Sequence, residues 1–416
     1  MLKRIHVHDL TLGMFIHEFC GSWMEHPFWR TRFLLTSAQD LQRIRATTIQ
    51  EVWIDTTRGR DTAAGAAAVT RDQASADAQA LLEQSQQLAA QAAAPPLAPT
   101  TMAQELQQAI AICSGTRAAV ADMFHAARMG QAVDVAATPR LVDGISASMA
   151  RNPHALISLA RLKTANEYTY MHSVAVCALM VALARQIGLD EATTRLAGQA
   201  GLLHDLGKAR VPQQLLDKPG KLTDAEFDVV RRHPVAGHEL LAGSGLHPQV
   251  LDACLHHHEK IDGSGYPHRQ AGAGISLLAR MAAVCDVYDA ITSDRPYKRG
   301  WDPALALHRM AEWSRSHFDN LLFQAFVKAI GIYPVGALVR LQSERLGVVV
   351  AQSEGALLAP HVKVFFSTRT GRRIPEELVD LAQQRAGDRI AAREDPRHWP
   401  FGDLAQLWSG RPSLRW

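Results

Sequence analysis

Apolar residues recur at three- and four-residue spacing through most of the chain between positions 101 and 330. Residues spaced in this way share one face of an α-helix, so the pattern predicts a series of helices. Glycines and prolines interrupt the pattern at intervals and indicate where helices end. We therefore expect an α-helical bundle over residues 101–334. Its clearest apolar stretch contains Val174, Cys177, Ala178, Val181 and Ala182.

The C-terminal region follows a different pattern. Beyond Pro334, apolar and polar residues alternate over 338–341, 347–351 and 362–366, which predicts short β-strands. We assign residues 335–416 to a small β appendage with a short helix and a C-terminal tail.

The N-terminal region divides into two parts. Residues 33–35 and 51–54 have the apolar content of short strands, and Ser37 stands where a helix N-cap is expected. Residues 1–57 are therefore predicted to form a small α+β module. Residues 58–100 are rich in Ala, Gln and Pro, with too few bulky apolar side chains to offset chain entropy, so we predict a flexible linker with a transient helix over 72–93. The fold class is mainly α, with a small module at each end.

Composition excludes several classes of protein. The formal net charge of +3 over 416 residues does not favour binding to a nucleic acid polymer. The longest apolar run, 174–184, is shorter than the about 20 residues that cross a bilayer, so we expect no membrane span. The 5 cysteines are widely spaced without a CxxC pair, which indicates free thiols in a reducing compartment. We expect a cytoplasmic protein.

Histidine and aspartate residues supply the candidate chemistry of the helical region. Neutral imidazoles and carboxylates are ligands that suit Fe, Mn or Zn. Burying a single carboxylate in an apolar helix costs free energy, and a metal ion would remove that cost. Any one of these residues could equally be an ordinary core or surface residue, so only the set points to a metal site. The set is His172, His204, Asp205, His233, His257, His258 and Asp286.

Two segments carry a resemblance to a known family. Residues 204–208, HDLGK, resemble the HDxGK signature of the HD hydrolase superfamily. Residues 257–267, HHEKIDGSGYP, resemble the HHExxDGxGYP signature of the HD-GYP family. Similar segments surround His172 and His233 and extend over 286–298, in the order that the family shows.

The resemblance covers residues 140–330 and implies roles for single residues. The seven residues of the set would hold two metal ions, with Asp205 bridging them. We expect Fe or Mn, with Zn and Ni as alternatives. Some family members hold a third metal with an acidic residue where this chain has Tyr168, so we expect two. The implied substrate contacts are Lys208, Tyr266, Asp289, Arg295 and Lys298.

The resemblance also implies an activity. A metal-dependent phosphodiesterase would hydrolyse cyclic di-GMP to pGpG, and further to GMP in some members, through a hydroxide that bridges the metals. Asp205 and Lys208 would be the catalytic residues. Two alternatives stay open: an HD nucleotidase acting on another nucleotide or cyclic dinucleotide, and a non-catalytic cyclic-dinucleotide receptor. The complete set of ligands favours an enzyme over a receptor.

The N-terminal module resembles a domain that is found before HD-GYP domains and is known as DUF3391. Residues 14–16, 23–28 and 52–56 carry this likeness, which assigns no chemistry. The helix expected over 101–130 is a candidate dimerisation element, so a homodimer is an open expectation.

Overall fold

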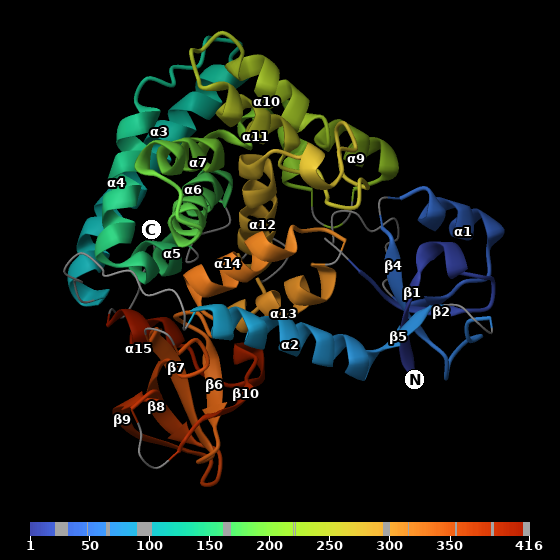
Figure 1. Cartoon of the computed structure of the whole chain (residues 1–416), viewed down its shortest axis with the longest axis vertical. Coiled ribbons are helices and arrows are strands. Elements are labelled where there is room, and N and C mark those ends of the chain that lie inside the picture. The colour runs from blue at the N-terminus through green and yellow to red at the C-terminus, as the bar shows by residue number, and fades with distance from the viewer. Residues whose placement is uncertain are drawn as a thin grey trace.

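The structure is a computed structural model of the whole chain (Figure 1). Among the residues that it describes, no helix is both long enough and apolar enough to cross a membrane. At 82–89, 103, 168 and 397 it describes the backbone alone. The description leaves out residues 21–31, 48, 64–66, 90–101, 161–167, 219, 221, 294–299, 315, 354–355, 384–386 and 411–416.

The N-terminal module is built on a five-stranded antiparallel sheet in the order β3-β2-β4-β1-β5. Helix α1, Ala38–Arg45, begins as predicted, because the Ser37 hydroxyl accepts a hydrogen bond from the backbone N–H of Asp40 at 3.3 Å. The predicted strands at 33–35 and 51–54 are confirmed. The strands are β1 (Leu2–His6), β2 (Phe15–Phe19), β3 (Phe33–Leu34), β4 (Glu51–Asp55) and β5 (Ala68–Thr70).

The segment predicted as a flexible linker, 58–100, contains β5 and the helix α2, Arg71–Ala89. The helix expected over 72–93 is thus present at Arg71–Ala89, as a packed helix rather than a transient one. Helix α2 packs against α13 and α14 and buries Ala74 and Ala78 at 1% and 2% exposure. Small side chains let helices approach closely, so an alanine-rich helix with few bulky residues is held by its neighbours. Figure 1 shows α2 running from the N-terminal sheet along the base of the helical domain.

The central domain is helical, as predicted, and α6 lies in its middle (Figure 1). Every residue from Met171 to Val181 is buried, so α6 is enclosed on all sides. The helices are α3 (Met102–Arg128), α4 (Thr138–Arg151), α5 (Pro153–Ala160), α6 (Tyr168–Gln186), α7 (Glu191–Leu203), α8 (Gln213–Leu216), α9 (Asp224–Val230), α10 (His233–Leu241), α11 (Pro248–His256), α12 (Leu277–Thr292), α13 (Pro303–Trp313) and α14 (Asn320–Ile330).

The C-terminal appendage is a second five-stranded antiparallel sheet, in the order β10-β6-β7-β8-β9, followed by the short helix α15, Leu404–Ser409. The predicted strands and the short helix are confirmed, while β9 and β10 were not foreseen. In β9 most residues are exposed, so its sequence lacks the apolar alternation of a half-buried strand. The strands are β6 (Leu338–Leu341), β7 (Arg345–Ala351), β8 (His361–Ser367), β9 (Arg372–Asp380) and β10 (Ile390–Arg393).

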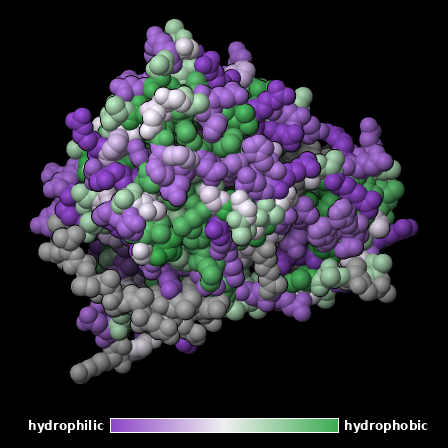
Figure 2. Space-filling view, turned by 45° about the horizontal axis from the view of Figure 1, so that its top comes forward, coloured by the Kyte–Doolittle hydropathy of each residue, from purple (hydrophilic) through white to green (hydrophobic). Residues whose placement is uncertain are grey.

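The largest hydrophobic core fills the helical domain and extends into both flanking modules. It includes Trp53 of the N-terminal sheet and Phe365 of the C-terminal sheet. The 5 cysteines are free and buried, as predicted. On the face shown in Figure 2, apolar residues gather in small groups separated by polar ones, as on ordinary globular proteins.

Candidate metal centre

The seven predicted ligands converge on one point inside the helical domain. His172 comes from the middle of α6, and His204 and Asp205 directly follow α7. His233 begins α10, the pair 257–258 follows α11, and Asp286 lies in α12. Sequence positions more than one hundred residues apart thus meet, because the ends of α7, α10 and α11 converge on the interior of α6 and α12.

One glycine allows α6 and α7 to approach closely enough for this. A Cβ atom on Gly201 would lie 2.9 Å from the Cα of Cys177 on α6. Any larger residue would therefore separate the two helices and move His204 away from His172. The rings of these two histidines are 5.1 Å apart between centroids.

The carboxylate of Asp205 lies in the centre of the group and is fully buried. Its Oδ2 is 3.4 Å from Nε2 of His172 and 3.4 Å from Nε2 of His204. Its Oδ1 is 3.2 Å from Nε2 of His233 and 3.9 Å from Nε2 of His257. Each oxygen of one carboxylate therefore faces a different set of imidazoles.

Asp286 completes the two sets of donor atoms. Its Oδ1 is 2.9 Å from Nε2 of His172 and 3.9 Å from Nε2 of His204. Its Oδ2 is 3.8 Å from Nδ1 of His258. Donor atoms lie within 4.8 Å of one another in three overlapping groups, which are His172–His204–Asp286, His204–Asp205–His257 and His233–His257–His258.

Hydrogen bonds on the far side of the rings fix three of the imidazoles. Each Nδ1 donates to the backbone carbonyl oxygen three residues earlier, at 2.8 Å. A carbonyl oxygen can only accept, so Nδ1 carries the hydrogen and Nε2 presents its lone pair to the centre. The pairs are His204 with Gly201, His233 with Val230, and His257 with Cys254.

His172 is oriented by a carboxylate instead. Its Nδ1 donates to Oδ2 of Asp289 at 2.6 Å, and the hydroxyl of Ser293 donates to the other oxygen at 3.3 Å. Asp289 was expected to contact the substrate, but its side chain is buried against His172, one helical turn after Asp286. This position suits it to orient the ring rather than to reach a phosphate or a base.

The pKa values of Asp205 and His258 favour the charge states that metal binding needs. Burial disfavours the charge of Asp205, but the nearby Lys208 and His204 outweigh it and hold the pKa of this carboxyl well below its usual range. Burial and the neighbouring His233 lower the pKa of His258 to about 3. Ionised carboxylates and neutral imidazoles are the forms in which these side chains bind metal ions.

The pKa of His172 is shifted in the opposite direction from that of His258. Burial alone lowers its pKa, but hydrogen bonds to three surrounding carboxylates outweigh burial and raise the pKa to about 10. A positive charge is thus favoured between Asp205 and Asp286, and a divalent cation can supply that charge in place of the proton.

Two buried atoms indicate that the donor set fits a metal. Among the described residues, Nε2 of His204 and Oδ1 of Asp205 are buried without a hydrogen-bond partner. Buried polar atoms are nearly always paired, because an unpaired one costs free energy. Both atoms point into the group of donors, where coordination would satisfy them.

Lys208 lies beside the centre, as its place in the sequence predicts. It belongs to the short 3₁₀ helix Leu206–Arg210, and its ammonium is 2.5 Å from Oδ2 of Asp205. The side chain keeps 20% exposure, so the ammonium borders the open side of the centre.

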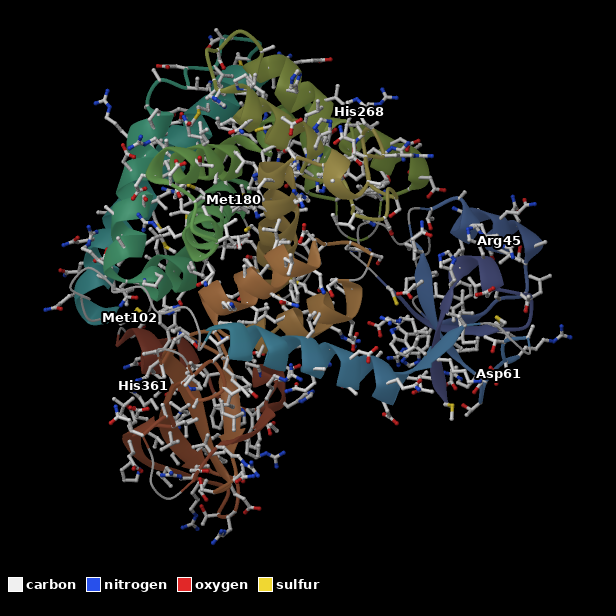
Figure 3. The ribbon with its side chains drawn as sticks, viewed as in Figure 1. Arg45, Asp61, Met102, Met180, His268 and His361 are labelled. Atoms are coloured by element: carbon white, nitrogen blue, oxygen red, sulfur yellow. The ribbon has the colours of Figure 1, made fainter. Side chains whose placement is uncertain are left out.

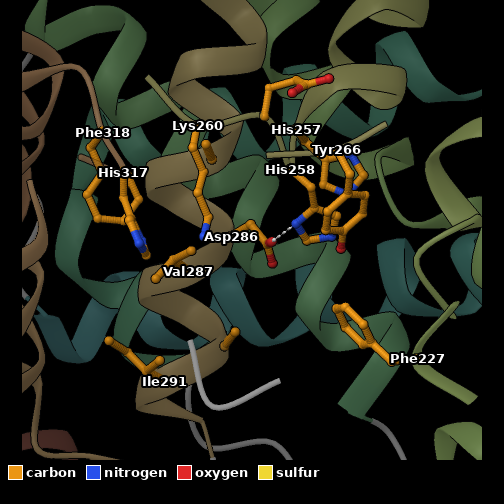
Figure 4. Close-up of a pocket in the computed structure, with 13 residues that line it drawn as sticks. Phe227, His257, His258, Lys260, Tyr266, Asp286, Val287, Ile291, His317 and Phe318 are labelled. Carbon is orange, nitrogen blue, oxygen red and sulfur yellow. Dashed lines mark ion pairs between the residues drawn. The ribbon is translucent and has the colours of Figure 1, made fainter. Parts of the chain in front are cut away.

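A pocket opens next to His258 and Asp286 (Figure 4). Tyr266 stacks on the ring of His258, with centroids 4.8 Å apart and planes at 29°. Phe227 meets Tyr266 edge-on at 6.4 Å. Tyr266 therefore lines the pocket, and its contact with a substrate stays a prediction.

The opposite wall of the pocket was not predicted. Figure 4 shows Lys260, His317 and Phe318 facing the space beside Asp286. Lys260 and His317 are buried, at 7% and 8% exposure. Lys260 stands at an unspecified position of the family signature, and His317 follows α13 without any local signal. Only the folded chain brings them together.

Three predictions fall outside the described residues. Arg295 and Lys298 belong to the segment 294–299, and the side chain of Tyr168 is not described either. Their roles stay predictions.

In a comparison with known proteins, each half of the chain matches a domain family. The family described as "Domain of unknown function (DUF3391)" matches residues 2–138, and the HD domain family matches residues 148–322. The first match extends well beyond the module predicted for 1–57 and includes α2 and α3.

Similar proteins carry names that state their activities. The cyclic di-GMP phosphodiesterase PA4108 of Pseudomonas aeruginosa is 55% identical over 99% of this chain and 96% of its own length. The cyclic di-GMP phosphodiesterase response regulator RpfG of Xanthomonas campestris is 45% identical over 36% of this chain and 42% of its own. The 3′3′-cGAMP-specific phosphodiesterase 3 of Vibrio cholerae is 35% identical over 40% of this chain and 36% of its own. The chain therefore belongs to the HD-GYP family of HD domain proteins, with a DUF3391 domain at its N-terminus.

Proposed function

We propose that the chain is a metal-dependent phosphodiesterase that opens cyclic di-GMP to pGpG. The observation that carries the proposal is the buried carboxylate of Asp205, whose two oxygens face two separate sets of imidazoles beside a pocket. The name of the Pseudomonas relative, similar over nearly the whole chain, supports cyclic di-GMP as the substrate.

The proposal includes two divalent cations, with Fe or Mn preferred over Zn or Ni. Asp205 would be shared between the two ions. When bound, such a pair supplies positive charge to a phosphodiester and acidifies water near neutral pH. One ion would be held by His172, His204 and Asp286, and the other by His233, His257 and His258.

The other side chains bind and orient the substrate. The Lys208 ammonium is placed to neutralise a phosphoryl oxygen, and it acts strongly because the adjoining centre is shielded from water. Tyr266 offers a ring on which a base can stack. From the resemblance we keep Arg295 and Lys298 as further contacts to phosphate or guanine.

The role that we propose for Asp289 can be tested with two substitutions. Asp289→Ala should weaken metal binding by about 10- to 100-fold, because the His172 ring loses its orienting partner. Asp289→Asn should restore most of the affinity, since an amide oxygen still accepts from Nδ1. Titration of metal-free protein with Mn²⁺ measures both. Equal losses in the two variants would contradict a positioning role.

The pocket wall offers a side chain, Lys260, that can recognise a guanine base of the substrate. The ammonium of Lys260 can donate to O6 and N7 of a guanine, whereas adenine offers an amino group in place of O6. Lys260→Met should lower kcat/KM for cyclic di-GMP by about tenfold, equivalent to roughly 1.4 kcal/mol, and reduce the preference over cyclic di-AMP. Hydrolysis of bis(p-nitrophenyl) phosphate, which has no base, should not change. Lys363→Met, on the C-terminal sheet, is the matched control, and an equal loss on both substrates would contradict base recognition.

A direct assay tests the proposed function. The full chain is loaded with Fe or Mn and incubated with cyclic di-GMP or 3′3′-cGAMP, and the products are separated by chromatography. Turnover of cyclic di-GMP to pGpG is expected, and the appearance of GMP would show a second cleavage. Exclusive turnover of 3′3′-cGAMP would favour the alternative substrate suggested by the Vibrio relative. If the chain binds a cyclic dinucleotide but hydrolyses none with Fe, Mn, Zn or Ni, the result would favour a receptor.

Two broader expectations belong with this proposal. We propose a cytoplasmic location, which the five buried free thiols support. The homodimer stays a prediction that sedimentation of the full chain can test.

A further inference from the structure

A second group of histidines lies at the end of α11 and shares no side chain with the centre around Asp205. His256 directly precedes two residues of that centre and is buried at 5% exposure. Its Nε2 lies 2.9 Å from Nδ1 of His268 and 3.1 Å from the side-chain amide nitrogen of Gln270. Figure 3 shows His268 toward the outside of the helical domain, away from Met180 in its interior.

The His256 ring is held in a fixed direction. Asp252, one helical turn earlier, accepts a hydrogen bond from Nδ1 at 2.8 Å. Nε2 therefore carries the lone pair and presents it to His268 and Gln270 in the loop that follows the signature segment. A carboxylate on the far nitrogen is the usual arrangement behind an imidazole that binds a metal.

The loop is held so that its two side chains meet His256. The carboxylate of Glu259 accepts from the backbone N–H of His268 at 2.7 Å and of Gln270 at 3.1 Å. Arg269 between them has a φ of 56°, in the left-handed region that side-chain-bearing residues seldom adopt. This turn brings the side chains on either side of Arg269 to the same ring.

We propose that His256, His268 and Gln270 bind one divalent transition metal of the zinc class. The amide of Gln270 can turn over, so that its oxygen takes the place of the nitrogen. Neighbouring donors of a tetrahedral zinc site with bonds of about 2.0 Å are roughly 3.3 Å apart, close to the separations seen here. Two imidazoles favour Zn, Cu or Ni over Mg or Ca. His268 is exposed, so water can complete the coordination.

The position of this site gives it a consequence for the neighbouring loop. The ion would join the end of α11 to residues 268–270, which follow Tyr266 closely in the chain. It would thus clamp the loop that forms one wall of the pocket. The proposal does not depend on the proposed activity, because its donors and its tests are separate from those of the Asp205 centre.

Metal counting tests the site. Full-length protein is loaded with Mn²⁺, dialysed against Zn²⁺ at low micromolar concentration, and its total metal content per chain is measured by mass spectrometry. The wild type should retain one equivalent more than His268→Asn. His268→Cys should keep the extra equivalent, because a thiolate replaces the imidazole, and so should His125→Asn, a control at an exposed position on α3. Equal contents in the wild type and His268→Asn would overturn the proposal. The Asn variant should still hold two equivalents at the Asp205 centre.

Proteolysis supplies a readout that needs no activity. Trypsin cleaves after the exposed Arg269, inside the proposed clamp. Zn²⁺ should slow this cleavage severalfold in the wild type and leave it unchanged in His268→Asn. The same dependence on Zn²⁺ in both proteins would contradict the clamp.

Discussion

Replacement of Asp205 by asparagine should lower the turnover of cyclic di-GMP by at least about a thousandfold. The amide has the size of the carboxylate but only one oxygen and no charge, so it cannot serve the two sets of imidazoles at once. The metal content should fall by one equivalent or more. Product chromatography and metal analysis of the same samples measure the two effects.

The control for this variant is Asp143→Asn. Asp143 pairs with Arg195 on the surface of the helical domain, and each side chain is about half exposed, at 50% and 47%. Exposed pairs contribute little to stability, so this variant should retain full turnover. Circular dichroism should show that both variants are folded. Unchanged turnover in Asp205→Asn would contradict the proposal that this centre carries the activity.

Replacement of Gly207 by alanine should destabilise the protein by about 3 kcal/mol or more. The added Cβ would lie 1.9 Å from the carbonyl oxygen of His233 and 2.4 Å from the backbone nitrogen of Gly237. Both atoms belong to the backbone of α10, so neither can turn aside as a flexible side chain would. The 3₁₀ helix and α10 would have to separate, which would also draw His233 away from Asp205. Urea denaturation measures the stability, and turnover measures the displacement.

Gly115→Ala is the matched control, since no atom lies within 4 Å of its added Cβ. Gly115 is inside α3, where alanine is favoured over glycine by about 1 kcal/mol. This variant should therefore gain stability while Gly207→Ala loses it. Equal stability of the two variants would show that α10 and the 3₁₀ helix can separate at little cost.

The sequence predicted the seven side chains that gather in this centre because all of them stand in segments that resemble those of one family. Four lie in the two short signatures, and the other three lie in the similar segments around His172 and His233 and over 286–298. Lys260 and His317 could not be predicted in this way, since the first is a variable position and the second lies far along the chain. Asp289 was placed near the substrate because it belongs to a similar segment. Its actual contact with His172 depends on the packing of α12 against α6, which no local pattern records.

Helical periodicity predicted where the helices lie, but it did not show how they pack against one another. It predicted the bundle, and it placed the apolar residues from Val174 to Ala182 on one face of a helix. In the fold α6 is surrounded, because α7, α12 and α14 all pack against it. At α2 the sequence predicted a helix but understated how firmly it is held. Its own apolar area is small, and its order comes from the contact with α13 and α14, which sequence composition does not reveal.

The position of α2 has a consequence for truncated versions of this protein. Ala74 and Ala78 belong to the same hydrophobic core as Met310 of α13 and Phe323 of α14. A fragment that begins at α3 would expose that apolar surface to water and would associate with other molecules through it. The boundary of the smallest well-behaved fragment therefore lies before β5, and for this chain an isolated catalytic domain must include part of its N-terminal neighbour.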